Sequence, residues 1–103
     1  MSLSSVSAQE LSQILKENEK VVLKFTATWC GPCKMLNPTL ERAGEVHPTV
    51  RFVEVDVEKE PELARAYQVR SIPAVFGLNN GNTAFQFVGN VPLSTLESHL
   101  QTL

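Results

Sequence analysis

The sequence predicts one α/β domain over residues 1–103, with a mixed central sheet of about five strands and about four helices around it. Two observations carry this prediction. Segments rich in β-branched and aromatic residues alternate with segments of helical periodicity, and a strand–helix–strand order requires parallel strands with a right-handed crossover. Near the end of the chain, two strand-like segments flank the turn sequence NNGN at 79–82, which is typical of an antiparallel hairpin.

The first 27 residues predict a weak strand, a helix and a strong strand. The polar segment SLSS at 2–5 favours only an edge strand. The sequence SAQE at 7–10 has the form of a capping box, and apolar residues then fall on one helical face, so we expect a helix over 8–18. The β-rich segment VVLKFTA at 21–27 predicts the strong strand.

A second helix is expected to begin just after Cys30 and to run to about Val46. Pro32 would lie in its first turn, where the missing N–H has no helical partner in any case. Pro38 would lie inside the helix, where a proline removes a backbone hydrogen bond and kinks the axis.

The second half of the chain completes the alternation with a strand, a short helix, the hairpin and a last helix. These elements are predicted over 50–57 (strand), 60–68 (helix), 73–78 and 83–89 (hairpin strands) and 92–103 (helix).

The composition is that of an ordinary globular protein, with 43% hydrophobic residues and a net charge of −2. Because there is no basic excess, binding to nucleic acid is not expected, and no apolar run has the length of a membrane span. The N-terminus has neither the positive nor the apolar region of a secretory signal, so a cytoplasmic location is expected.

The two cysteines of the chain, Cys30 and Cys33, stand at the predicted start of the second helix. Unpaired N–H groups and a partial positive charge at a helix N-terminus lower the pKa of a thiol and favour its thiolate. One helical turn brings the sulfur of Cys33 beside that of Cys30. This placement predicts thiol–disulfide exchange, in which Cys30 attacks a substrate disulfide and Cys33 resolves the mixed disulfide.

Three other interpretations of the cysteine pair stay open. Half of a zinc site would lack partners, since structural zinc takes about four ligands and neither His47 nor His99 has ligand-like spacing to the cysteines. A purely structural disulfide would close too short a loop to remove much unfolded-state entropy. Two inert thiols would leave the Trp, Gly and Pro around them unexplained. The preferred redox chemistry needs no metal and no organic cofactor, because the two sulfurs carry the electrons.

The segment FTATWCGPCKM at 25–35, followed by Pro38, resembles the active site of the thioredoxin family. The segment RSIPA resembles the one that carries the cis-proline of the family, here Pro73, and FVGN resembles its glycine-bearing loop, here with Gly89. The resemblance extends over essentially the whole chain, and motif, proline and glycine follow one another at the spacing of the family.

The resemblance implies a thioredoxin fold and a protein-disulfide reductase with a place in electron transport and cell redox homeostasis. Protein disulfides would be its substrates, a thioredoxin reductase its electron donor, and a monomer its working form. The Ile72–Pro73 bond would be cis, and the backbone at Ile72 would pair with an extended substrate segment. The implied substrate-binding residues are Trp29, Gly31, Pro32, Ile72, Pro73 and Gly89. The alternative is a redox-independent binding or subunit module that uses the same apolar surface.

The chain departs from the family at Lys24, where a buried aspartate that exchanges protons with the resolving thiol is usual. Strand alternation puts Lys24 and Glu54 on matching faces of two strands that a crossover joins. We hypothesise that they form a partly buried pair beneath Cys33, in which Lys24 favours thiolates and Glu54 accepts the proton. In the alternative, Lys24 extends to solvent and has no catalytic part.

Overall fold

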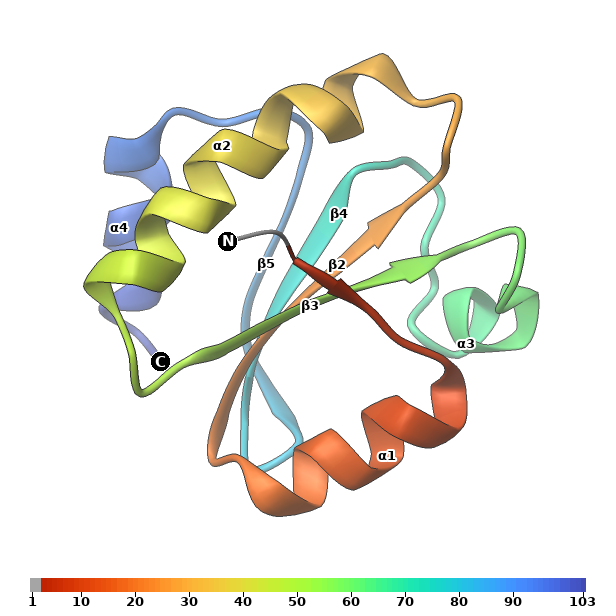
Figure 1. Ribbon diagram of the computed structural model, residues 1–103, viewed down its shortest axis with the longest axis horizontal. Coiled ribbons are helices and arrows are strands. Elements are labelled where there is room, and N and C mark those ends of the chain that lie inside the picture. Colours follow the sequence, from red (N-terminus) through yellow and green to blue (C-terminus); the bar gives the residue numbers. More distant parts are fainter. Residues whose placement is uncertain (1–2) are drawn as a thin grey trace.

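The computed structural model describes residues 3–103, which form a five-stranded sheet between helices (Figure 1). Its elements in chain order are β1 (Ser4–Ser5), α1 (Ala8–Glu17), β2 (Lys20–Thr26), α2 (Gly31–Val46), β3 (Arg51–Asp56), α3 (Pro61–Ala66), β4 (Ala74–Asn79), β5 (Asn82–Val88) and α4 (Leu93–Leu100). The predicted element order is therefore confirmed. Ser2, with which the predicted first strand begins, lies outside the described residues.

The sheet is mixed, as predicted, with the strand order β1-β3-β2-β4-β5. Strands β1 and β2 both pair with β3 in parallel, whereas β4 runs antiparallel to β2 and β5. The weak first strand is an edge strand. Strand β2 lies at the centre, and its carboxyl end leads directly to the loop that begins α2.

The helices cover the two faces of the sheet in pairs, with α1 and α3 on one side and α2 and α4 on the other (Figure 1). Alternation along β2 divides its side chains between two cores. Val21, Leu23 and Phe25 pack into the core under α1 and α3, whereas Val22 packs into the core under α2 and α4. Lys24 belongs to this second face, so the sheet itself directs it toward α2.

Local signals explain the element boundaries. The Ser7 side chain accepts from the backbone N–H of Glu10, and the Glu10 carboxylate accepts from the backbone N–H of Ser7, which is the predicted capping box. Asn80 and Gly81 both have positive φ, at 51° and 82°, as a two-residue type I′ hairpin turn requires. Helices α3 and α4 end two to three residues before the predicted limits. No helix in residues 3–103 has the length and apolar character needed to cross a membrane.

A close approach at Gly77 in β4 gives a test of the packing under α2 and α4. A Cβ atom at this position would clash with Cε2 of the buried Phe85 ring. We expect Gly77→Ala to lower the free energy of unfolding by about 1–3 kcal/mol, measured by urea denaturation, because the ring must leave its position. Gly44→Ala is the matched control, since its Cβ would meet Phe52 at an ordinary 3.6 Å. Equal stabilities of the two variants would contradict this account.

Candidate active site

A disulfide joins Cys30 and Cys33 at the N-terminus of α2. Cys30 is the residue that caps the helix, and Cys33 lies within its first turn. Their Cα atoms are 5.3 Å apart, within the usual range for a disulfide. The backbone N–H of Cys33 donates to Sγ of Cys30 at 3.2 Å. A thiolate at Cys30 would therefore have both this N–H and the positive helix end as partners.

The two sulfurs differ in access. Cys33 is fully buried at 0% exposure, and Cys30 is 4% exposed. Both pack with Ala27 in a small apolar cluster that Val57 and Ile72 border. Cys30 is thus the more accessible of two well-covered cysteines.

Trp29 lies beside this cluster and is exposed to solvent over 66% of its surface. Its indole Nε1–H donates to Glu58 Oε2 at 3.0 Å. The sequence reasoning did not identify Glu58 as part of the site. Its position just after β3 was the available signal, because the parallel strands β2 and β3 end at the same edge of the sheet.

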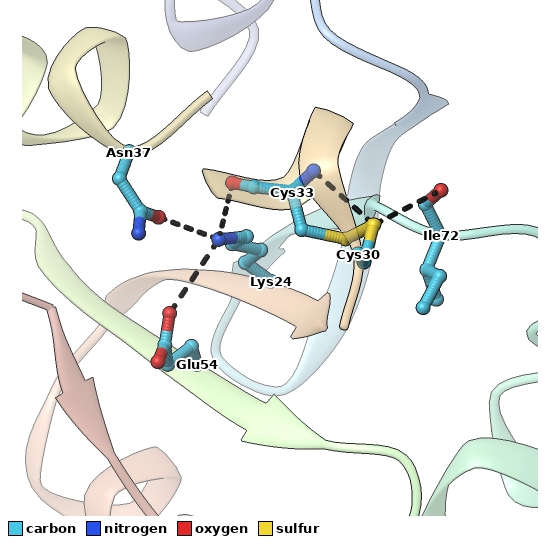
Figure 2. Close-up of a disulfide and its surroundings, with 6 residues drawn as sticks. All are labelled: Lys24, Cys30, Cys33, Asn37, Glu54 and Ile72. Atoms are coloured by element: carbon cyan, nitrogen blue, oxygen red, sulfur yellow. Dashed lines mark hydrogen bonds and ion pairs between the residues drawn. A yellow bond between two sulfur atoms is a disulfide. The ribbon is translucent and has the colours of Figure 1, made fainter. Parts of the chain in front are cut away.

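The loop before β4 brings the predicted proline segment to the disulfide. The Ile72–Pro73 bond is cis, as expected. The carbonyl oxygen of Ile72 lies 3.9 Å from Sγ of Cys30 (Figure 2). A disulfide sulfur has no hydrogen to donate, so this distance becomes a hydrogen bond only when Cys30 is a thiol. The N–H of Gly89 donates to the Pro73 carbonyl at 2.8 Å, which ties the glycine loop to the same segment.

The predicted substrate-binding residues differ in exposure, and Ile72 and Gly89 are half-buried. Gly31 and Pro32 are exposed at the start of α2, beside the exposed Trp29. Pro73 is buried, so it shapes the loop and adds little to the surface.

Lys24 is buried beneath α2, with only 1% of its surface exposed. Its ammonium Nζ donates to the carbonyl oxygen of Cys33 at 2.9 Å and to Oδ1 of Asn37 (Figure 2). It also lies 3.5 Å from Oε1 of Glu54, which is its direct partner in the β2–β3 register. The hypothesised pair therefore exists, and the alternative in which Lys24 extends to solvent is wrong.

Asn37 is a member of this cluster that the sequence reasoning missed. It lies four residues after Cys33, which puts it on the same face of α2 one turn further along. A polar residue at this spacing, above a strand that carries a lysine, was the signal that could have revealed it.

Burial lowers the pKa of Lys24 below its ordinary value of 10.5, and the Glu54 carboxylate offsets part of this effect. The unfolded chain therefore binds more protons than the folded chain between the lowered pKa and 10.5. We expect the unfolding free energy of the oxidised protein to rise with pH through this window. Lys24→Met should lack this rise, as measured by urea denaturation at stepped pH. Parallel curves for the two proteins would show that Lys24 titrates alike in both states.

Comparison with known proteins agrees with this geometry. The family model described as Thioredoxin matches residues 2–102. A thioredoxin of Mycoplasmoides gallisepticum is 40% identical over 92 residues, which cover 89% of this chain and 92% of that protein.

Solved structures give the same result. The oxidised form of mitochondrial thioredoxin 3 from Saccharomyces cerevisiae superimposes with a TM-score of 0.88 at 32% identity, covering 98% of this chain and 95% of the other. Fasciola hepatica thioredoxin also has a TM-score of 0.88, at 28% identity, with 98% and 100% covered. The sequence match over nearly the whole chain, the shared fold and the disulfide at the start of α2 together show that this protein belongs to the thioredoxin family.

Proposed function

We propose that this protein reduces disulfide bonds of other proteins, with Cys30 as the nucleophile and Cys33 as the resolving thiol. The observation that carries the proposal is the Cys30–Cys33 disulfide at the N-terminus of α2, next to the cis-proline loop. Redox-independent binding is not favoured, because a binding surface alone would not require two cysteines joined at a helix end.

The reaction begins with the reduced protein. The Cys30 thiolate attacks one sulfur of the substrate disulfide, forming a new S–S bond while the substrate bond breaks. The other substrate sulfur leaves as a thiolate and takes a proton from solvent. The Cys33 N–H, at 3.2 Å from Cys30 Sγ, supports the attacking form.

In the second step, the Cys33 thiolate attacks Sγ of Cys30. The mixed disulfide breaks, the second substrate sulfur leaves as a thiolate, and the Cys30–Cys33 bond forms. Two electrons have then passed from the protein to the substrate, and no metal or organic cofactor takes part. Another dithiol donor must reduce the Cys30–Cys33 bond before the next cycle.

Substrate segments would bind in an extended form along the exposed residues at the start of α2 and the cis-proline loop. Trp29 and Pro32 offer apolar surface, Gly31 leaves room for close approach, and the Ile72 backbone pairs with the substrate main chain. Pro73 and Gly89 hold that backbone in place through their mutual hydrogen bond.

Lys24 and Glu54 would adjust the ionisation of the resolving thiol. A buried ammonium beside Cys33 favours the thiolate by charge attraction. Glu54 is 22% exposed and can exchange a proton with solvent, so it would be the acceptor that replaces the aspartate usual in the family.

We propose that the protein works as a monomer in the cytoplasm, where a thioredoxin reductase reduces its disulfide. It would thereby take part in electron transport and redox homeostasis. The membership in the thioredoxin family supports this proposal.

Trapping tests the assignment of the two cysteines. Cys33→Ser should stall at the mixed disulfide through Cys30, so substrate proteins should appear as reducible adducts on non-reducing gels and be identified by mass spectrometry. Cys30→Ser, the matched control, should capture nothing. An intact Cys33→Ser protein that captures no partner would contradict the mechanism.

The pH dependence of disulfide reduction tests the proposed roles of Lys24 and Glu54. Lys24→Asp should move the rate profile to higher pH, because an anion replaces the cation that favours thiolates. Glu54→Gln should slow the resolving step, because the proton acceptor is lost. Stopped-flow kinetics at stepped pH would measure both effects, and profiles superimposable on that of the parent would exclude these roles.

A further inference from the structure

We propose that Asn37 is a positioning residue for disulfide exchange, whose side chain holds the Lys24 ammonium against the Cys33 end of the redox pair. This inference rests on the proposed function. It adds Asn37, which has no role in the mechanism described above. It starts from the Lys24–Asn37 hydrogen bond in Figure 2.

Three acceptors surround Nζ of Lys24. Helix α2 supplies the Cys33 carbonyl at 2.9 Å and the Asn37 amide oxygen, and strand β3 supplies Glu54 at 3.5 Å. An ammonium has three N–H donors, so each acceptor can be satisfied, whereas a neutral amine has only two. The arrangement therefore fits a lysine that stays charged in spite of its burial.

The acceptors pull the ammonium in two directions. The Cys33 carbonyl and Asn37 lie one helical turn apart and draw it toward α2, whereas Glu54 draws it toward β3 (Figure 2). Strand β4 adds no acceptor of its own, because the β4 residue opposite Lys24 in the register is the apolar Val75. Without the amide, the flexible end of the lysine would shift toward Glu54 and away from the redox pair.

Such a shift matters because Lys24 is the only buried cationic side chain in residues 3–103. Strand β3 adds the buried Asp56 on the same face as Glu54, a second carboxylate that works against a thiolate, and its side chain accepts the backbone N–H of Glu58 at 2.8 Å. On α2, Lys34 is exposed, so water screens it. Glu58, which accepts from Trp29 beside Cys30, and Arg70, which lines a hollow with Trp29 and Ile72, are also exposed, so water screens them too. The attraction between ammonium and thiolate falls with distance, so the position of Lys24 sets its strength.

The direct test compares the reduced parent protein with Asn37→Leu, which has a similar volume and no amide. The ultraviolet absorbance of thiolates should titrate at higher pH in the variant, with about threefold less thiolate at neutral pH and a similarly slower reduction of a protein disulfide. Asn79→Leu is the matched control. Its amide also makes a part-buried hydrogen bond, to the Leu103 carbonyl at 3.1 Å, but it lies at the far end of β4. A parental titration for Asn37→Leu would overturn the inference.

A double-mutant cycle tests whether Asn37 acts through Lys24. In a Lys24→Met background, Asn37→Leu should cause no further change in the thiolate titration, because there is no ammonium to position. An equal shift in both backgrounds would contradict the inference, since the amide would then act on the sulfurs by another route.

The failure of this inference can be told apart from the failure of the proposed function. If the parent, Asn79→Leu and Asn37→Leu all reduce a protein disulfide at the same rate, only this inference fails. If the parent reduces none, the proposed function fails as well.

Discussion

The buried ammonium of Lys24 imposes the constraint on which the active-site end of the fold depends. A lysine at 1% exposure requires acceptors within reach, because an unpaired buried charge costs several kcal/mol. The parallel β2–β3 register places Glu54 directly opposite, and the first turns of α2 lie above. Strand β2, strand β3 and helix α2 are therefore linked through one atom, Nζ of Lys24, directly under the redox pair.

The sheet topology explains why the reactive groups meet at this place. Strands β2 and β3 end at the same edge, so the loop to α2 and the turn with Glu58 lie together there, and Trp29 bridges them. The cis-proline loop enters β4, the other neighbour of β2, from the same edge. A central strand with a parallel neighbour on one side and an antiparallel one on the other thus gathers three loops around Cys30.

Most of the fold and the reacting atoms could be predicted from the sequence, because their signals are local. The capping box at Ser7, the helix start at Cys30 and the hairpin turn at Gly81 each depend on neighbouring residues only. The Lys24–Glu54 pair was predictable because strand alternation determines the face of the sheet on which each side chain lies. Contacts that depend on the distance and tilt between elements could not be predicted in this way. Glu58 reaches Trp29, and Asn37 reaches Lys24, only because of how β3 and α2 lie against β2.

On the proposed mechanism, the two sulfurs receive electrostatic support from different sources. This would account for a buried charge at Lys24 that stability alone does not require. An apolar residue at position 24 would avoid the desolvation cost and would often be neutral or favourable for folding. The helix end and the Cys33 N–H already serve Cys30, the attacking sulfur. They do less for Cys33, which lies further into the helix and is completely buried. A cation fixed at the Cys33 carbonyl would attract the negative charge of a thiolate there. We therefore propose that the lysine acts on the second step of the exchange, for which the helix N-terminus provides little help.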